Sequence, residues 1–207
     1  MLQTHSLSVH QGDVTLWSNL SLSIAPTERL GIFAPSGYGK TTLGRVLAGW
    51  QLPTGGSVTL DGKPLPTSGY CPVQLVPQHP ERTFNPVRTV GASLRDVWLP
   101  DAEWFDALSL NQRLMARYPD EVSGGELARI ALLRALAPQT RYLIADEITA
   151  QLDPLLQAQV WRFLLELSKQ RPLGLIVISH GRALLDGVCT RVWQPDTLSP
   201  HSESMDK

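Results

Sequence analysis

The chain has 207 residues, 43% of them hydrophobic, so it is long and apolar enough to bury one core and is expected to form one compact unit. Its 18 basic and 19 acidic residues give a formal net charge of -1. This balance excludes binding to nucleic acid or to an anionic membrane through overall charge, so partners must be recognised by shape and local contacts.

The two cysteines, Cys71 and Cys189, lie far apart without metal-ligand spacing, which favours a reducing compartment over a disulfide or zinc framework. The N-terminus has no basic segment that leads into an apolar run. The longest apolar run, residues 173–178, is much shorter than the roughly twenty residues that span a bilayer. We therefore expect the chain to be cytosolic unless another protein carries it to a membrane.

The first third of the chain predicts short strands that lead into a glycine-rich turn. Strands are expected at residues 7–9, at residues 20–24, where polar and apolar residues alternate, and at residues 29–33. A helix is expected to begin at Thr41, directly after the turn. The order strand, glycine-rich turn, helix is the context that a phosphate-binding loop needs.

The rest of the chain predicts a helical insert followed by a return to alternating strands and helices. Between about residues 78 and 121, prolines separate short helical candidates, which we interpret as the insert. The expected strands are 57–60, 73–76, 142–145, 175–178 and one near Val192, and the expected helices are 89–98, 101–108, 125–136, one that begins at Pro154 and a short one after residue 178. The polar tail at residues 195–207 is expected to be loose.

The glycine-rich turn has the composition of a phosphate-binding loop. Its candidate ligand-binding residues are Ser36, Gly37, Tyr38, Gly39, Lys40, Thr41 and Thr42. Successive backbone N–H groups can wrap a phosphate there, Lys40 can reach the β- and γ-phosphates, and the Thr41 hydroxyl can ligate Mg²⁺. The usual pattern has glycine where this chain has Ala34, and alanine would weaken phosphate binding if that position required a positive φ.

Two adjacent acids follow the apolar strand at residues 142–145. Asp146 is placed to hold Mg²⁺ through water, and Glu147 can polarise the attacking water as a general base. His180 follows another apolar strand, so it is expected at the same edge of the sheet, where it can contact the γ-phosphate and hold that water. Gln78 follows the strand at residues 73–76 and can contact Mg²⁺ or water while it opens the insert.

Two further segments have both a structural and a functional interpretation. Ser123, Gly124 and Gly125 begin a helix, so they offer a hydroxyl and free amides to an anion, although a simple capping box would have the same sequence. Asp153 precedes Pro154 and is a candidate N-cap of the next helix.

In this order, the motifs around Lys40, Ser123 and Asp146 resemble those of the ATPase subunits of ABC (ATP-binding cassette) systems, over roughly residues 5–194. The resemblance implies an α/β fold of the P-loop NTPase type, with a RecA-like core sheet, an N-terminal antiparallel β subdomain and a helical subdomain insert. It implies a single domain, with the core at about 1–78 and 137–195, the insert at about 79–136 and a loose tail at 196–207.

The same resemblance implies ATP and Mg²⁺ as cofactors and assigns roles to several residues. His180 matches the switch histidine of these ATPases, and Asp153 matches an aspartate that contacts the opposite subunit. The signature at residues 123–125 reaches across a dimer to the γ-phosphate held by the other subunit. The aromatic residue that stacks on adenine in many relatives has no clear counterpart here; His10 is the nearest candidate, and Trp17 is better explained by packing.

Residues 73–80 and 84–90, which include Asn85-Pro86-Val87-Arg88-Thr89-Val90, resemble the ATPases of bacterial dipeptide, oligopeptide and nickel importers. Such importers contain two permease subunits in the membrane, two ATPase subunits and an extracytoplasmic substrate-binding protein. The resemblance therefore places this chain, as a peripheral protein, on the cytoplasmic face of the inner membrane, with Gln78 and residues 79–98 as the coupling surface. The absence of a long C-terminal extension favours nickel or a metal chelate over a peptide as substrate.

Two alternatives are left open by the sequence. A non-transport ABC ATPase of the DNA-repair or translation type usually has long coiled coils, paired cassettes or zinc modules, and this chain shows none of these patterns. A degenerate cassette that binds ATP and barely hydrolyses it is favoured by Ala34 and by the missing aromatic residue. The presence of both Glu147 and His180 argues against a degenerate cassette.

Overall fold

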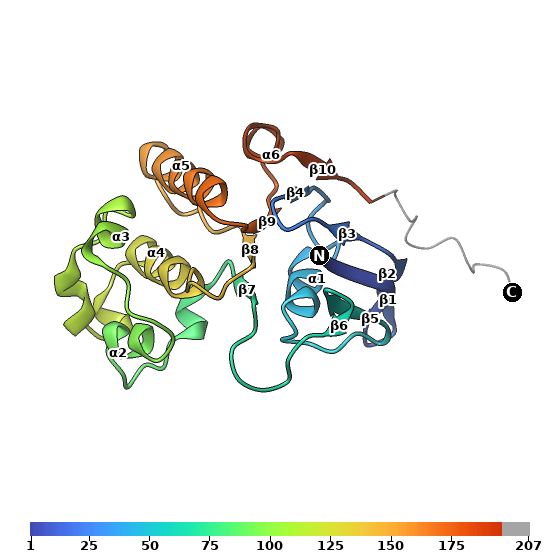
Figure 1. The fold of residues 1–207 in the computed structure, drawn as a ribbon, viewed down its shortest axis with the longest axis horizontal. Helices are drawn as coiled ribbons and strands as arrows, with labels where there is room; N and C mark the ends of the chain where they lie inside the picture. The colour runs from blue at the N-terminus through green and yellow to red at the C-terminus, as the bar shows by residue number, and fades with distance from the viewer. Residues whose placement is uncertain (196–207) are drawn as a thin grey trace, which may run out of the picture.

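The computed structural model describes residues 1–195, and their strands form two sheets (Figure 1). One sheet is entirely parallel and has the strand order β10-β4-β9-β8-β7. Its strands are β4 (Arg29–Ile32), β7 (Val73–Val76), β8 (Tyr142–Asp146), β9 (Gly174–Ile178) and β10 (Arg191–Trp193). Every residue of β8 and β9 is buried, as expected of central parallel strands that are covered on both faces.

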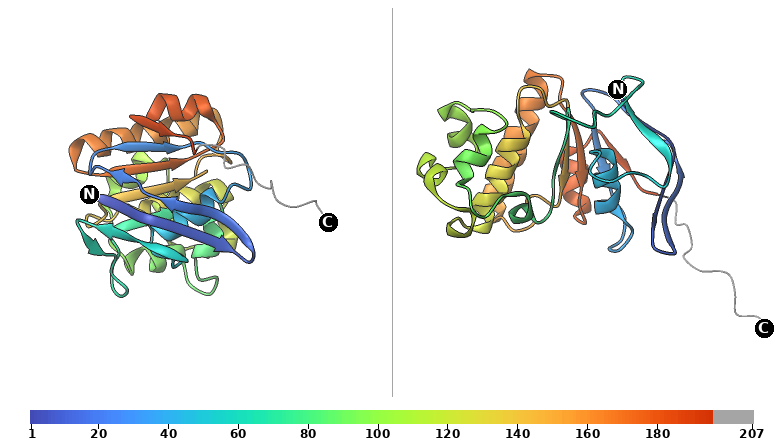
Figure 2. Two further views of the ribbon diagram at one scale, coloured as in Figure 1. Left: turned by 90° about the vertical axis from the view of Figure 1, so that its right-hand side faces the viewer. Right: turned by 90° about the horizontal axis from the view of Figure 1, so that it is seen from below.

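The second sheet is antiparallel and lies beyond α1 (Lys40–Leu47), which separates it from the parallel sheet (Figure 2). Its strands are β1 (Leu2–Gln11), β2 (Val14–Leu20), β3 (Ser23–Ile24), β5 (Gly55–Leu60) and β6 (Lys63–Pro64), in the order β2-β1-β5-β6 with β3 paired to β1. One hydrophobic core joins α1 to both sheets.

The single strand predicted at residues 20–24 is wrong. In the structure β2 ends at Leu20 and a separate β3 begins at Ser23. The break lies beside Thr4 of β1, whose hydroxyl bonds to the backbone on both sides of it. The Thr4 hydroxyl donates to the Leu20 carbonyl (3.0 Å) and accepts from the Leu22 N–H (2.8 Å), so a side chain replaces ladder hydrogen bonds there. The alternation of polar and apolar residues correctly indicates one buried face, but this face belongs to two separate strands.

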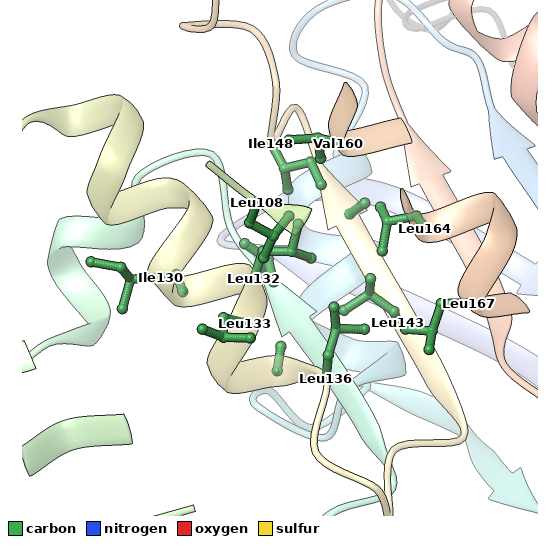
Figure 3. Packing of buried hydrophobic residues seen from close by; sticks show 14 of the residues in the cluster. Leu108, Ile130, Leu132, Leu133, Leu136, Leu143, Ile148, Val160, Leu164 and Leu167 are labelled. Atoms are coloured by element: carbon green, nitrogen blue, oxygen red, sulfur yellow. The ribbon is translucent and has the colours of Figure 1, made fainter. Parts of the chain in front are cut away.

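Helices cover the other face of the parallel sheet. The helices that pack on this face are α4 (Gly124–Ala135), α5 (Pro154–Gln170) and α6 (Arg182–Val188). Beyond α4 and α5 lie α2 (Val90–Arg95), α3 (Ala102–Ala107) and the 3₁₀ helices η1 (Pro80–Thr83), η2 (Gln112–Ala116) and η3 (Pro119–Glu121). Figure 3 shows Leu133 of α4, Leu136 directly after it, and Leu164 and Leu167 of α5 around Leu143 of β8. Each such fully buried leucine stabilises the fold by about 1.5–3 kcal/mol.

Side-chain caps set where the helices begin. The Thr89 hydroxyl accepts from the Ala92 N–H at the start of α2, and Asp153 Oδ1 accepts from the N–H groups of Leu155 and Leu156 at the start of α5. Capping residues are readable in sequence, and the predicted starts of these helices agree with the structure within two residues. The predicted tail lies outside the described residues, apart from residue 195.

The predicted α/β class is confirmed, with a parallel core sheet, an antiparallel N-terminal sheet and additional helices. Connections at the carboxyl ends of β4, β7, β8 and β9 gather at one edge of the parallel sheet. In open parallel sheets that edge is where ligands bind, and it is where the candidate residues lie.

Candidate functional site

A pocket of about 440 Å³ lies at this edge of the parallel sheet. Its walls come from the turn between β4 and α1, from the residues after β7, β8 and β9, and from the β1–β2 hairpin. The lining residues are Gln11, Leu16, Ser36, Gly37, Gly39, Lys40, Thr41, Thr42, Gln78, Asp146, Glu147 and His180. The fold therefore brings together segments that are separated by up to about 170 residues in the sequence.

The turn from β4 to α1 is a loop whose shape depends on two glycines. Gly37 and Gly39 both have φ of 78°, a left-handed conformation that favours glycine. Gly39 immediately precedes α1, so the first free N–H groups of the helix face the pocket. Tyr38 is the one predicted loop residue that does not line the pocket, because its ring lies edge-on against Trp17 at 5.5 Å.

Lys40 is buried and its ammonium group is held within the loop. Nζ donates to the carbonyl oxygens of Ala34 (2.5 Å) and Pro35 (2.8 Å). Burial lowers the pKa of Lys40, while Glu147 and Asp146 partly offset that effect. Ala34 is not among the residues with positive φ within the described part of the chain, so alanine at this position causes no backbone strain.

Asp146 ends β8 and is almost completely buried, with 1% of its surface exposed. It accepts a hydrogen bond from the Thr41 side chain, yet Oδ2 has no hydrogen-bond partner among the described residues. Burial, and to a lesser degree the charge of Glu147, raises the pKa of Asp146. A buried carboxylate oxygen without a partner, beside a hydroxyl, is an environment that fits a hard cation with oxygen ligands, such as Mg²⁺.

Glu147 lies next to Asp146, but its backbone leaves the strand conformation, because its φ of 53° is left-handed. Its Oε1 accepts from the backbone N–H of His180 at 2.7 Å, and its Oε2 lies 3.4 Å from the Ser179 hydroxyl. The His180 ring is half exposed, and its Nε2 lies 3.7 Å from Glu147 Oε1. The structure thus places the predicted base and the predicted histidine together, with Gln78 lining the same pocket.

Ser123, Gly124, Gly125 and Asp153 do not line this pocket. Ser123 caps α4 in a capping box with Glu126, whose carboxylate also accepts from the Ser123 hydroxyl at 2.6 Å. That bond is the main reason why the pKa of Glu126 lies below its usual value. The two glycines face the loop before α5, since a Cβ on Gly124 would lie 3.3 Å from Gln151 Oε1 and one on Gly125 would lie 3.1 Å from Leu152 Cδ2.

The sequence analysis missed two lining residues, Gln11 and Leu16. His10, the candidate for contact with adenine, is not a lining residue, whereas its neighbour Gln11 is. Trp17 is buried and packs as expected. The dipeptide Gly12-Asp13 between two alternating stretches is a hairpin signal, and it would have shown that residues near it return toward the glycine-rich loop.

Comparison with known proteins agrees with this geometry. The sequence profile of the family described as "ABC transporter" matches residues 17–150, which is more than half of the chain. The chain belongs to the ABC transporter family. It is an ATP-binding cassette and an ATPase, and the predicted transporter class is confirmed.

The curated relatives include importer subunits. The nickel import ATP-binding protein NikE of Escherichia coli strain K12 is 32% identical over 90% of this chain and 76% of its own length. The Fe(3+) ions import ATP-binding protein FbpC of Serratia marcescens is 31% identical over 88% of this chain and 56% of its own length.

Solved structures support the P-loop fold class. A dimeric structure of MJ0796, described as a bacterial ABC transporter cassette, has a TM-score of 0.79 and 21% identity over 94% of both chains. The cbiO1 protein of Clostridium perfringens, part of the cbiONQ complex, has a TM-score of 0.73 and 22% identity, covering 93% of this chain and 83% of that chain. At these identities the likeness concerns the fold alone.

Proposed function

We propose that this chain is the ATP-hydrolysing subunit of a bacterial importer for nickel or another metal ion or chelate. Relatives named for nickel import and for Fe(3+) import support a metal substrate. Peptide import is the second candidate, and it rests on the resemblance of residues 84–90 to peptide-importer ATPases. The observation that carries the ATPase itself is the pocket in which Lys40, Asp146 and Glu147 meet.

In the proposed reaction Lys40 and the loop amides bind the β- and γ-phosphates of ATP. Thr41, Asp146 and Gln78 would hold Mg²⁺, directly or through water, and that ion neutralises charge on the transferred phosphoryl group. Glu147 accepts a proton from water as the water oxygen attacks the γ-phosphorus, and the bond to the β–γ bridging oxygen breaks to give ADP and phosphate. His180 orients the water beside Glu147, consistent with the 3.7 Å between Nε2 and Oε1.

We infer that the complete site needs a second ATPase subunit, either a copy of this chain or a related sister. Gly124 and Gly125 carry the first N–H groups of α4, and the Ser123 N–H before them donates to Glu126 Oε2, but none of these three residues lines its own chain's pocket. The dimeric MJ0796 cassette, which shares this fold, supports such an arrangement. Each Ser123 cap would then cover the γ-phosphate bound to the other subunit, and Asp153 would lie at the contact.

The chain is proposed to bind two permease subunits on the cytoplasmic face of the inner membrane, with a substrate-binding protein on the other side. No helix within residues 1–195 is long and apolar enough to cross a bilayer. Residues 79–136 would act as the helical subdomain of a single domain, and Gln78 with residues 79–98 as its coupling surface. Val87 (78% exposed) lies in that surface and Leu99 (74% exposed) follows it, and both could be covered by a permease loop.

The test is Mg·ATP hydrolysis by the purified chain, with its partner ATPase present, compared with Glu147→Gln. We expect phosphate release to fall by about 10²–10⁴-fold while ATP binding is retained, because the variant lacks the general base. Glu103→Gln, on the exposed surface of α3, is the matched control and should hydrolyse ATP like the wild type. Equal background rates for wild type and Glu147→Gln would instead identify a degenerate cassette.

A second experiment tests the transporter assignment. Two hydrophobic subunits and a second ATPase should co-purify with the chain from detergent-solubilised membranes. Recovery with nucleic acid or ribosomes and without any hydrophobic subunit would contradict the proposal.

A further inference from the structure

The segment at residues 148–153 connects Glu147, the proposed general base, to α5, a helix of which no residue lines the pocket. The Ala150 N–H donates to the Glu147 carbonyl at 3.0 Å, so the chain turns directly after the base. Glu147 itself has a left-handed φ of 53°. A residue other than glycine keeps such a conformation only when its surroundings hold it there. The contacts of this segment therefore bear on where the Glu147 carboxylate lies.

Thr149 is buried in the middle of this segment, with 3% of its surface exposed. Its Oγ1 accepts from Gln157 Nε2 at 2.9 Å and from Trp161 Nε1 at 3.1 Å. A hydroxyl oxygen has two lone pairs, so these two bonds occupy both of its acceptor positions. Gln157 and Trp161 lie four residues apart on α5, which is close to one helical turn. One face of α5 thus supplies both donors.

The two ends of the segment are held as well. At its start, the Glu147 N–H donates to the last carbonyl of β9 at 3.0 Å, and at its end Asp153 caps α5. Ile148 belongs to the same hydrophobic core as Val160 of α5 (Figure 3). Only Ile148 separates Thr149 from Glu147. Any shift of the Thr149 backbone must consequently be absorbed by the dihedral angles of Ile148 or of the base itself.

We propose that Trp161 and Gln157 are positioning residues for Glu147. By holding Thr149 they fix the segment after the base and keep the Glu147 carboxylate beside the His180 N–H, 2.7 Å away. The inference rests on the proposed function, in which Glu147 activates the attacking water. Neither donor nor Thr149 lines the pocket, so their effect falls on the rate of hydrolysis and not on ATP binding.

The experiment measures kcat, KM and the ATP dissociation constant of the purified chain with its partner ATPase present, and expresses kcat per ATP-binding site. Trp161→Phe and Gln157→Leu each remove one donor and should lower kcat by about 2–10-fold, the effect of one neutral hydrogen bond. Thr149→Val removes the acceptor of both bonds. It should lower kcat by about 10–100-fold, because misplacement by about 1 Å costs up to about 10²-fold. KM and the ATP dissociation constant should not change.

Three further variants separate positioning from packing. Thr149→Ser keeps the hydroxyl and should retain the wild-type kcat. Adding Trp161→Phe to Thr149→Val should lower kcat no further, because the indole N–H has already lost its acceptor. Gln159→Leu is the matched control, since Gln159 also lies on α5 but donates to the Ser109 hydroxyl (2.8 Å) and the Ala107 carbonyl (3.2 Å), outside the catalytic segment. It should leave kcat unchanged.

A wild-type kcat in Thr149→Val, or equal losses of kcat in Gln157→Leu and Gln159→Leu, would overturn the inference and leave the ATPase proposal intact. Lower thermal stability of Thr149→Val without a change in kcat per site would likewise reduce Thr149 to a packing residue. Failure of the proposed function has a different signature, namely equal background rates for the wild type and Glu147→Gln, and it would overturn both. An unchanged ATP dissociation constant verifies that each variant is folded.

Discussion

Asp146 is a single residue of the site whose ionisation is made unfavourable by burial. Its carboxylate is buried and Oδ2 has no partner within residues 1–195, so ionisation is disfavoured and the pKa of Asp146 is raised. An acid with a raised pKa in the folded state contributes stability below its ordinary pKa of 3.8 and loses that contribution as the pH rises through the raised value. At neutral pH the site is therefore less stable until a cation is bound.

Asp146→Asn should accordingly stabilise the nucleotide-free protein more at pH 7 than at pH 4. The asparagine does not ionise, so the difference in Tm between variant and wild type should grow with pH, by about 2–4 °C for each kcal/mol of lost penalty. Differential scanning calorimetry across this range measures it. Mg·ATP should raise the Tm of the wild type and have little effect on the variant. A Tm difference that shrinks as the pH rises would contradict the raised pKa.

At the same scale, the sequence predicted most of the residues that line the pocket, because each belongs to a short motif with a fixed neighbour. Lys40 follows a glycine-rich turn, and Asp146 follows an apolar strand. The left-handed φ of Glu147 was not predictable, since it arises from tertiary contacts such as the bond from the His180 N–H. Gln11 was missed because its place in the pocket depends on how the hairpin returns to the loop.

At the scale of the elements, contacts of Arg134 connect η1 with α4. η1 follows Gln78, and α4 is the helix that Ser123 caps. Arg134 of α4 donates from Nη1 to the Thr83 carbonyl (3.0 Å) and from Nη2 to the Thr83 hydroxyl (2.7 Å). Its guanidinium also lies 4.3 Å from the centre of the Phe84 ring. These contacts join the segment that follows Gln78 to the helix that Ser123 caps.

Arg134→Met should destabilise the chain by about 1–3 kcal/mol, because two charge-assisted hydrogen bonds are lost and the Thr83 carbonyl is left without that partner. The midpoint of urea denaturation measures this change, and Arg134→Lys should recover part of it. Arg162→Met, on the exposed side of α5, is the control and should change stability by no more than about 0.5 kcal/mol. Equal effects of the two methionine variants would show that the link to η1 contributes nothing.

Element boundaries could be predicted where a local signal sets them and not where tertiary contacts do. Thr89, Ser123 and Asp153 are caps, and the helices after them begin where the sequence indicated. The antiparallel sheet was less readable: β1 contains register shifts around Val9, and the left-handed Asn19 lies near the end of β2. A bulge changes which face a residue occupies, so periodicity alone misplaces such strands.

On the scale of the whole molecule, the fold keeps the phosphate loop apart from the start of α4, the second segment that was predicted to bind phosphate. The loop around Lys40 lines the pocket, whereas Ser123 and Gly124 begin α4 outside it. If both groups bind the same nucleotide, as proposed, two sites would be completed by pairing with another cassette, in which each subunit would provide one half of each site. This separation leads to a test with two inactive variants.

Lys40→Ala and Gly124→Asp should each be inactive alone and recover ATPase activity when mixed. Lys40→Ala lacks the phosphate-loop charge. In the proposed dimer Gly124→Asp would put a carboxylate against the γ-phosphate bound to the other subunit, while an acid in the first turn of α4 favours the helix. In a mixed dimer one site combines both defects and the other has none. Random pairing makes half of the dimers mixed, each with one intact site of two, so roughly a quarter of wild-type turnover should return. Recovery only when a sister ATPase replaces one variant would show that this chain pairs with a different subunit. No recovery in either mixture would mean that each pocket works without the other chain's α4.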